Sequence, residues 1–482
     1  MLTAEGIAVR GSVEEAVRAG RIAQAAWGAV TLARRLAVLR RFRQMAAERS
    51  ADLVEAVGSS SRSRAQVLTS EVLPLLAACR FLETNAPGLL RAQRLGRRGK
   101  PLWLGRVKSE IRREPLGLVL ILGPANYPLF LPGVQVLQAL AAGNAVLLKP
   151  GKGASAAANA LARLLTACGL PRGALMLLDE APEAGIAAIE AGVDKVFLTG
   201  GSRAGAAVQQ ACARHQTPSV LELSGCDAAV VMPGADVSRA VDAICFASLL
   251  NAGQTCIAPR RILVARPLVE RFEQTLLQRL GAAPAIAVAP AVFHAAMDVA
   301  ERSMRLGARR LTPPPGDAAQ MTPQLFTNVT PEMPLANADL FLPLLSILPT
   351  DGDQLAATAN ACSYALGASI FGPLPAALAL AARLTVCSVT INDAVAPTAD
   401  PRIPFGGRRA SGYGTTRGAA GLLQMTTLKT IQTRRGNFLP HLHAERPGDE
   451  ALFSAYLRAA HGSSMGARLR ALFALLRQLR HR

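Results

Sequence analysis

The spacing of apolar residues predicts helices in the first part of the chain, and strands alternating with helices after it. From Val13 to Val57, apolar residues recur every three or four positions, as in amphipathic helices. Farther on, short apolar runs occur at Leu118–Leu122, Ala145–Leu148 and Ala174–Leu178, with a clear helical pattern at Ser155–Cys168. Strands that alternate with helices predict a parallel sheet in an α/β fold.

A further strand, a glycine-rich turn and a helix are predicted near residue 200. The strand is residues 196–198, and the turn contains Gly200, Gly201, Ser202 and Gly205. The amino end of a helix offers free N–H groups and a positive dipole end, so this turn is a candidate phosphate site. The spacing is not G-x-G-x-x-G, however, and an ordinary tight turn explains these residues equally well.

Length and composition predict a globular protein of two or three domains. A chain of 482 residues is too long for one hydrophobic core, and 50% of its residues are hydrophobic. The apolar stretches are interrupted well before the roughly 18 residues that a membrane-spanning helix needs. The first thirty residues contain three glutamates and do not have the apolar centre of a signal peptide. We therefore expect no transmembrane helix and a cytoplasmic location.

The formal net charge of +20 has two interpretations. A basic surface attracts polyanions, which would indicate a nucleic-acid or membrane partner. Only six of the 53 basic residues are lysine, however, and the excess of Ala, Arg and Leu extends along the whole chain. Aromatic residues, which stack on bases, make up only 4% of the chain. We therefore expect no nucleic-acid partner, although a polyanion-binding protein stays an alternative.

The eight cysteines form no C-x-x-C pair and have no histidine at metal-ligand spacing. We expect neither disulfides nor a metal site. Free cysteine is among the most buried residue types, so seven of the eight are predicted to be core residues. Cys256 is different, because it follows the turn-like sequence Gly253-Gln254-Thr255.

Three segments carry a resemblance to a known family. They are Gly123-Pro-Ala-Asn-Tyr-Pro128, Leu221-Glu-Leu-Ser-Gly225 and Asn251-Ala-Gly-Gln-Thr-Cys256. Together they resemble the aldehyde dehydrogenase superfamily, and the likeness extends from about residue 110 to residue 432. Further pieces follow the family's order: Lys149-Pro150, Phe341 with Pro343, Ile391-Asn392-Asp393, residues 404–407 and residues 411–414.

The resemblance implies an α/β fold with a Rossmann-like cofactor domain, a catalytic α/β domain and bridging strands. We place the cofactor domain at residues 1–106 and 116–221 and the catalytic domain at residues 222–403. The bridging and oligomerisation strands are then residues 107–115 and 427–433, and a basic tail covers residues 440–482. The early position of the first motif favours a homodimer.

The resemblance also assigns roles to residues. Cys256 is implied as the nucleophile and Glu222, 34 residues before it, as the general base. A thiolate first adds to the aldehyde, because hydride leaves readily only from a tetrahedral hemithioacetal. Asn126 and the backbone N–H of Cys256 would bind the oxyanion, and Glu222 would activate the water that cleaves the thioester. The residues implied to bind NAD or NADP are Lys149, Lys152, Gly200, Gly201, Ser202, Gly205, Asp339 and Phe341.

Several positions depart from the family pattern, among them Leu342 where glycine is usual, and three bear on the chemistry. Ser224 stands where glycine is usual, which reduces backbone freedom beside Glu222. Lys152 stands where an acidic residue normally favours the ribose 2′-hydroxyl, so we expect a preference for NADP. Asp339 replaces a glutamate that binds the nicotinamide ribose, and its carboxylate reaches about 1.5 Å less. We keep as alternatives a family member that releases an acyl-CoA and a non-catalytic descendant.

The tail lies outside the likeness and ends in a predicted amphipathic helix. Its apolar side chains form one stripe among basic neighbours. Such a helix either packs against the enzyme body or a partner subunit, or lies on an anionic membrane surface. The stripe is Leu469, Leu472, Phe473, Leu476 and Leu479, and the basic residues are Arg468, Arg470, Arg477 and Arg480.

Overall fold

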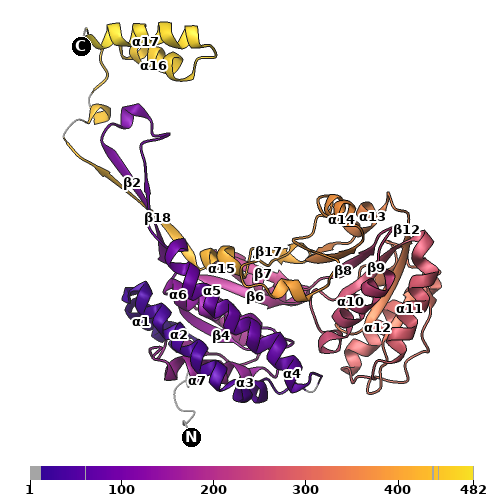
Figure 1. Ribbon diagram of the computed structural model, residues 1–482. Coiled ribbons are helices and arrows are strands. Elements are labelled where there is room, and N and C mark those ends of the chain that lie inside the picture. The colour runs from indigo at the N-terminus through magenta and orange to yellow at the C-terminus, as the bar shows by residue number, and fades with distance from the viewer. Residues whose placement is uncertain (1–11, 60, 437–438, 443, 481–482) are drawn as a thin grey trace. The chain divides into compact units, whose positions relative to one another are not determined.

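A computed structural model describes residues 12–59, 61–436, 439–442 and 444–480 of the chain (Figure 1). The chain divides into two compact units. Unit 1 is Met1–Gln93 with Ile111–Lys429, and unit 2 is Arg94–Glu110 with Thr430–Arg482.

The first sheet of unit 1 has the strand order β17-β7-β6-β3-β4-β5, and all pairs except β17 with β7 are parallel. The predicted strands and the parallel arrangement are confirmed. The strands are β3 (Leu118–Leu122), β4 (Ala145–Lys149), β5 (Leu175–Leu177), β6 (Lys195–Gly200), β7 (Ser219–Leu223) and β17 (Gly412–Tyr413).

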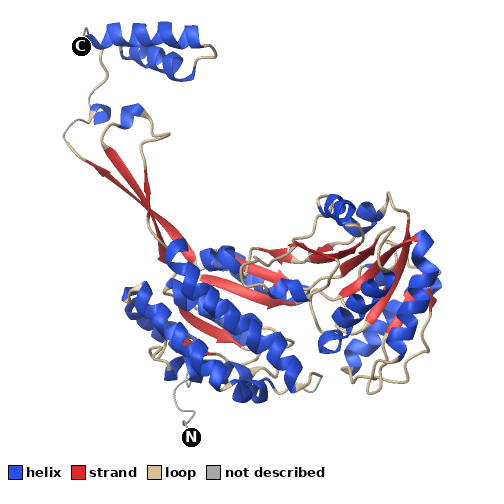
Figure 2. Ribbon diagram, viewed as in Figure 1, coloured by secondary structure: helices blue, strands red, loops and turns tan. Residues whose placement is uncertain are grey.

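Helices cover both faces of this sheet, because alternate residues of a strand point to opposite sides (Figure 2). Val119 and Ile121 of β3 face one core, and Leu118 and Leu120 face the other. The amphipathic region predicted from Val13 to Val57 is confirmed as three helices. On the first face lie α2 (Leu32–Glu48), α3 (Ser50–Val57), α5 (Leu73–Leu89), α6 (Phe130–Ala142) and α7 (Ser155–Ala167); on the second lie α1 (Val13–Ala29), α8 (Pro182–Glu190) and α9 (Ser202–His215).

The second sheet of unit 1 has the order β10-β11-β12-β9-β8-β14-β15 and is parallel except for β10. Its strands are β8 (Asp227–Val231), β9 (Pro259–Ala265), β10 (Arg309–Arg310), β11 (Gln324–Thr327), β12 (Leu344–Thr350), β14 (Gly367–Phe371) and β15 (Ser388–Ile391). Its helices are α10 (Val237–Leu249), α11 (Val269–Gly281), α12 (Pro290–Arg305), α13 (Leu355–Asn360) and α14 (Leu374–Ala381). The boundary placed between residues 221 and 222 falls inside β7, so the two sheets separate a few residues later.

Six of the seven cysteines predicted as core residues are buried, but Cys387 is exposed. That prediction was wrong for Cys387, because it precedes β15, a strand at the edge of the second sheet whose residues are only half-buried.

One helical run, Arg64–Leu89, is long and apolar enough by composition to cross a membrane, which the sequence analysis did not single out. It consists of α4 (Arg64–Val67), a π-helical turn (Leu68–Val72) and α5. Leu75, Cys79 and Leu82 of α5 are buried in the core with α2 and α6, which is the position of a core helix.

The described part of unit 2 includes the α-helices α16 (Asp449–His461) and α17 (Met465–Arg480), which pack against each other. The strands β1 (Gln93–Leu95), β2 (Val107–Pro115) and β18 (Thr426–Arg434) form a three-stranded sheet in the order β1-β2-β18. Thus the predicted tail helix is present, and the two segments expected to bridge are strands. Bridging itself stays a prediction.

Candidate active site

The loop that carries Cys256 has an unusual backbone. Asn251, Ala252 and Gly253 have positive φ angles of 52°, 55° and 78°, a region that side chains other than glycine rarely adopt. A Cβ on Gly253 would lie 2.5 Å from the carbonyl carbon of Leu342, so only glycine fits there. The loop is therefore held in one conformation against the segment that follows Asp339.

Asn126 connects the first motif to this loop. Its side-chain Nδ2 donates a hydrogen bond of 2.8 Å to the backbone carbonyl of Gln254. The backbone carbonyl of Asn126 accepts a hydrogen bond of 2.9 Å from Nδ2 of Asn251. The hydroxyls of Tyr127 and Thr255 lie 2.7 Å apart. An amide nitrogen has two N–H groups, so Asn126 keeps one for another acceptor.

A buried ion pair, Arg62 with Glu71, stabilises the turn that carries Asn126. Nη2 of Arg62 lies 2.6 Å from Oε1 of Glu71, and the two side chains are 2% and 0% exposed. Oε2 of Glu71 accepts from the backbone N–H groups of Leu129 and Phe130 at the start of α6, at 2.8 and 2.9 Å. Arg62 also donates to the carbonyl of Asn126 at 3.3 Å. The pair therefore fixes the turn that presents Asn126.

Glu222 lies near the carboxyl end of β7 and is almost completely buried, with 3% of its surface exposed. Oε2 accepts a hydrogen bond of 2.6 Å from the hydroxyl of Thr416, while Oε1 has no partner. Burial raises the pKa of Glu222, and the nearby Arg417 guanidinium and the Thr416 hydroxyl oppose that rise. The carboxylate therefore has one oxygen held and one available.

Cys256 shares this electrostatic environment. Burial, with a smaller contribution from the Glu222 carboxylate, raises the pKa of the Cys256 thiol to about 12, and Arg417 opposes the rise. Cys256 thus rests as a neutral thiol, and a base must take its proton before it can act as a nucleophile.

Two residues that depart from the family pattern, Ser224 and Asp339, contact each other in the structure. The hydroxyl of Ser224, two residues after Glu222, donates a hydrogen bond to Oδ2 of Asp339. The other oxygen, Oδ1, is buried and has no partner. Arg260 holds the next residues, since Nε donates to the carbonyl of Leu340 at 2.6 Å and the guanidinium lies 5.2 Å from the ring centroid of Phe341.

A family model described as the aldehyde dehydrogenase family matches residues 7–431. The chain belongs to this family. Its predicted identity and its predicted fold class are thus confirmed.

Individual proteins similar to this aldehyde dehydrogenase have names that describe the same family. A 4,4'-diapolycopene aldehyde oxidase of Methylomonas sp is 31% identical over 379 residues, which are 76% of this chain and 71% of that protein. A succinate-semialdehyde dehydrogenase (NADP+) of Deinococcus radiodurans is 30% identical, over 84% of this chain and 87% of that protein. The solved Mycobacterium tuberculosis aldehyde dehydrogenase in complex with NAD+ is 26% identical, has a TM-score of 0.81, and covers 89% of this chain and 91% of that one.

The residues predicted to bind the cofactor of this dehydrogenase fit a dinucleotide. Gly201 caps the start of α9, and no atom lies within 4 Å of the place a Cβ would take, so the helix end is open to a phosphate. Gly205, in contrast, packs α9 against Leu223 and plays a packing part. The unpartnered Oδ1 of Asp339 suits a ribose hydroxyl. Phe341 follows Asp339 by two residues, and its ring lies beside the guanidinium of Arg260.

The predicted binding site for the adenosine part of the cofactor contains a carboxylate, Glu180, that the sequence analysis did not find. Burial lowers the pKa of Lys149 at the end of β4, against the influence of Glu180. Glu180 accepts hydrogen bonds from the backbone N–H groups of Gly153 and Ser155, at 2.7 and 2.8 Å. Lys152 lies in the same turn and is exposed.

Sequence reasoning about this aldehyde dehydrogenase missed Arg62, Glu71, Thr416, Arg417 and Glu180. All five reach the site from segments distant in the chain, and Thr416 is 194 residues from Glu222. A single charged residue without a motif around it gives no sequence signal that separates it from a solvated surface residue. Within the described residues, no group of three or more His, Cys, Asp or Glu side chains could hold a metal ion.

Proposed function

We propose that the enzyme oxidises its aldehyde to a carboxylic acid through a hemithioacetal and then a thioester on Cys256. The observation that carries the proposal is Glu222, buried, with one oxygen unpartnered and electrostatically coupled to Cys256. A carboxylate shielded from solvent, with a raised pKa, suits general base catalysis near neutral pH. The enzyme resembles relatives whose names describe aldehyde oxidation.

The steps use this chain's own groups. The Cys256 thiol gives up its proton to water, and its sulfur bonds to the carbonyl carbon. The free N–H of Asn126 and the backbone N–H of Cys256 donate to the oxygen that becomes negative. The bound nicotinamide supplies the hydride acceptor. When the carbonyl re-forms, hydride leaves carbon and a thioester remains.

Hydrolysis completes the reaction. Glu222 takes a proton from water, and the water oxygen bonds to the thioester carbon. The carbon–sulfur bond then breaks, and the thiolate and a carboxylic acid are released. The buried base favours this outcome over release of an acyl-CoA, which needs no activated water.

Kinetics with aliphatic and aromatic aldehydes, followed by absorbance of the reduced cofactor, test this proposal. Cys256→Ala is expected to abolish turnover, whereas Glu222→Gln is expected to retain one fast turnover per site and then stop. Faster turnover with coenzyme A and an acyl-CoA product would favour the acyl-CoA alternative. Absence of activity in the wild-type enzyme with every aldehyde would favour the non-catalytic alternative.

We propose NADP as the preferred cofactor on the basis of Lys152. Its exposed ammonium can attract a 2′-phosphate, while Glu180 is already engaged by two backbone N–H groups. Lys152→Glu should then shift the ratio of kcat/KM for NADP over NAD toward NAD by about tenfold or more. A wild-type preference for NAD would contradict the proposal.

We also propose a cytoplasmic homodimer, based on the strands β2 and β18 that the family resemblance assigns to oligomerisation. Light scattering coupled to size-exclusion chromatography should give twice the mass of one chain, and a monomer or tetramer would contradict it.

We propose, finally, that unit 2 binds an anionic membrane surface. Residues 94–110 and 430–482 contain 15 Arg and Lys against 4 Asp and Glu, a net charge of +11 out of the total of +20. The charge is therefore concentrated in the smaller unit. The family match ends at residue 431, so α16 and α17 lie beyond it.

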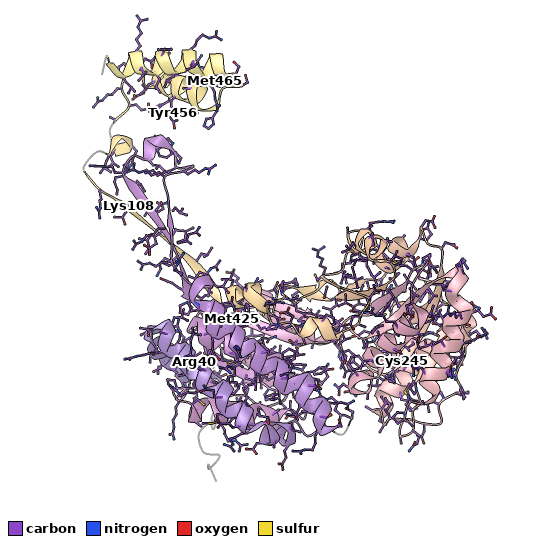
Figure 3. The ribbon with its side chains drawn as sticks, viewed as in Figure 1. Arg40, Lys108, Cys245, Met425, Tyr456 and Met465 are labelled. Carbon is purple, nitrogen blue, oxygen red and sulfur yellow. The ribbon has the colours of Figure 1, made fainter. Side chains whose placement is uncertain are left out.

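The apolar face of α17 is exposed over the residues of unit 2 that the structure describes. Ala471 is buried on the side toward α16, whereas a stripe of large apolar side chains is between 42% and 78% exposed. Arginines flank this stripe, and Trp103 of the same unit is 63% exposed. Figure 3 shows the side chains of both helices, with Tyr456 and Met465 labelled. The stripe is Met465, Leu469, Leu472, Phe473, Leu476 and Leu479.

An apolar stripe with arginine neighbours suits the interface of an anionic bilayer, where apolar side chains enter and cations meet headgroups. Flotation with vesicles of phosphatidylglycerol and phosphatidylcholine should recover the enzyme, and vesicles of phosphatidylcholine alone should recover far less. Phe473→Ser with Leu476→Ser should abolish recovery. Leu374→Ser with Leu378→Ser, at equally exposed positions of α14, is the matched control and should float like wild type.

Trp103 gives a second signal, because its emission should move to shorter wavelength on anionic vesicles and the change should vanish in Trp103→Phe. Equal recovery of the stripe variant and the wild type would overturn the membrane proposal. A loss of dimer mass in the stripe variant without lipid would instead identify the stripe as an interface between copies.

A further inference from the structure

Two buried cysteines that are far apart in the sequence lie side by side in unit 1. Cys226 directly precedes β8, and Cys362 lies between α13 and β13 (Tyr364–Ala365). Strand β14 pairs in parallel with β8, with Ala368 opposite Ala228, and this pairing brings the two segments together. Each cysteine has 1% of its surface exposed. The two thiols therefore share one buried environment.

Two arginines hold the backbone around this pair. Nε of Arg261 donates a hydrogen bond of 2.9 Å to the backbone carbonyl of Cys226, and its Nη2 donates one of 3.3 Å to the backbone carbonyl of Ala359 in α13. Nη1 of Arg409 donates a hydrogen bond of 3.1 Å to the backbone carbonyl of Cys362. A single guanidinium thus joins the segment of Cys226 to the helix that leads to Cys362, and two positive charges lie near the thiols.

The two thiols differ in acidity because they bind each other. The Cys226 S–H donates to the Cys362 sulfur, and this hydrogen bond lowers the pKa of Cys362 below its usual range. The positive charges of Arg261 and Arg409 lower it further. The same hydrogen bond, together with burial, raises the pKa of Cys226. Cys362 therefore rests as a thiolate near neutral pH, next to a second thiol, which is the arrangement of redox-sensing cysteine pairs.

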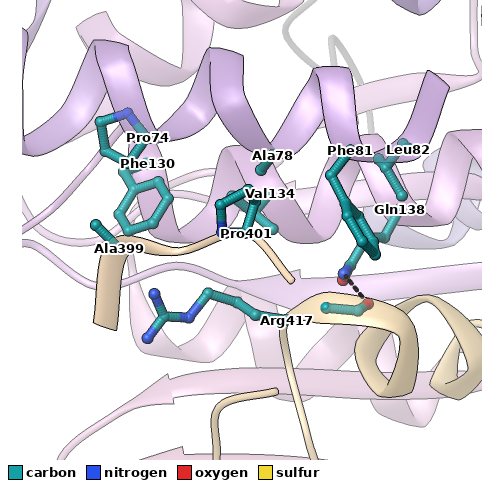
Figure 4. Close-up of a pocket in the computed structure, with 11 residues that line it drawn as sticks. Pro74, Ala78, Phe81, Leu82, Phe130, Val134, Gln138, Ala399, Pro401 and Arg417 are labelled. Atoms are coloured by element: carbon teal, nitrogen blue, oxygen red, sulfur yellow. Dashed lines mark hydrogen bonds between the residues drawn. The ribbon is translucent and has the colours of Figure 1, made fainter. Parts of the chain in front are cut away.

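Cys362 is within reach of a small oxidant. Ala361 and Ser363, on either side of it, are exposed, and local opening of such a surface loop costs little free energy. Cys256, in contrast, is a neutral thiol, because burial raises its pKa to about 12. Arg417, which lines the small pocket of Figure 4, opposes that rise only in part. Since the thiolate is the form that reacts with oxidants, Cys362 is expected to react before Cys256.

We propose that Cys362 and Cys226 form a redox modification site, at which a hydroperoxide such as hydrogen peroxide produces a disulfide that reversibly slows turnover. The Cys362 sulfur bonds to one peroxide oxygen, the O–O bond breaks, and the hydroxide released takes up a proton to become water. The Cys226 thiol then loses its proton and its sulfur bonds to the Cys362 sulfur, while the S–O bond breaks and a second water leaves. The two thiols together lose two electrons, which reduce the peroxide.

The disulfide would act on the active site through Gly225, the residue before Cys226. A Cβ on Gly225 would lie 3.3 Å from the carbonyl oxygen of Cys256 and 3.1 Å from Cβ of Leu366, so the backbone packs closely against the nucleophile loop. Glu222 lies three residues before Gly225 on the same segment. A covalent bond brings two sulfurs closer than van der Waals contact and pulls on this backbone. The expected consequence is displacement of the base and the nucleophile from their positions.

Mass spectrometry of the full-length enzyme tests the pair. After treatment with hydrogen peroxide and alkylation of the remaining thiols, a digest made without reductant should contain the Cys226 peptide linked to the Cys362 peptide. Dithiothreitol should remove the link. Cys226→Ala should instead leave a sulfenic acid on Cys362 that dimedone traps, because the second thiol is missing.

Cys245 supplies the matched control, since it is also buried and burial raises its pKa to about 11. Cys245→Ala should form the link like wild type. Peroxide should remove most of the turnover from both of these proteins, and dithiothreitol should restore it. Cys362→Ala should keep most of its turnover at the same dose of peroxide.

Two results would overturn the inference. One is a peroxide-treated wild type that lacks the linked peptide, including one in which Cys256 is oxidised while Cys226 and Cys362 stay reduced. The other is a complete link with unchanged turnover. The wild-type link and its reversal carry the test where a variant does not fold. The peptide measurement needs no aldehyde, so this inference and the proposed function can fail separately.

Discussion

Ser224 donates a hydrogen bond to the carboxylate of Asp339, so two of the departures from the family pattern contact each other. A serine hydroxyl fills space next to the shorter carboxylate and fixes one of its oxygens. The pair therefore forms one unit, in which the change at one position accommodates the change at the other.

The coupling of these two residues is testable by a double-mutant cycle. Ser224→Gly leaves Asp339 without its donor, and Asp339→Glu brings a longer side chain against the hydroxyl. Each single change should raise the KM for the cofactor by about 5- to 30-fold, while the double variant should recover most of the loss, because contacting residues couple by about 0.5–3 kcal/mol. Strictly additive effects would show that the residues act independently.

The buried ion pair of Arg62 and Glu71 should be a strong determinant of stability. Glu71→Gln or Arg62→Met leaves a buried partner unpaired and should cost about 3–5 kcal/mol in the free energy of unfolding, measured by urea denaturation. Arg62→Met combined with Glu71→Leu removes both charges and should be less destabilised than either single variant. Equal or greater destabilisation of the double variant would contradict this account.

Thr416 should act as a positioning residue for Glu222. Thr416→Val removes the hydrogen bond to Oε2, which raises the pKa of Glu222 further, so the acidic limb of the kcat profile should move to higher pH. kcat at neutral pH should fall by about tenfold with little change in KM, and Thr416→Ser should restore both profile and rate. A loss of activity with an unchanged pH profile would indicate only a packing role.

Asp227, at the start of β8, should make stability depend on pH. Burial raises its pKa to about 8, so the folded protein holds this proton at pH values where the unfolded chain has lost it. Its stabilising effect is complete below the ordinary carboxyl range and is lost as the pH rises toward 8. The urea midpoint should therefore fall less between pH 5 and pH 8 in Asp227→Asn than in wild type. Parallel pH curves for the two proteins would contradict the shift.

The sequence predicted four strands of the first sheet, β3 to β6, because local apolar runs carry that information, and short motifs supplied the three residues proposed for the chemistry. Arg417 and Thr416 could not be found in this way. They lie nearly 200 residues after Glu222 in the sequence, and only the fold brings them close to it. The pairing of Ser224 with Asp339, 115 residues apart, was hidden for the same reason. Cys387 was misjudged because residue type does not reveal an edge strand.

The thioester on Cys256 is the central claim, and mass spectrometry of the Glu222→Gln variant tests it most directly. After incubation with butanal and NADP, the peptide that contains Cys256 should carry one butyryl group, and one reduced cofactor should form per site. Treatment with hydroxylamine should remove the group, as expected for a thioester. Turnover by this variant without an acyl group on Cys256, or an acyl group on another cysteine, would contradict the account.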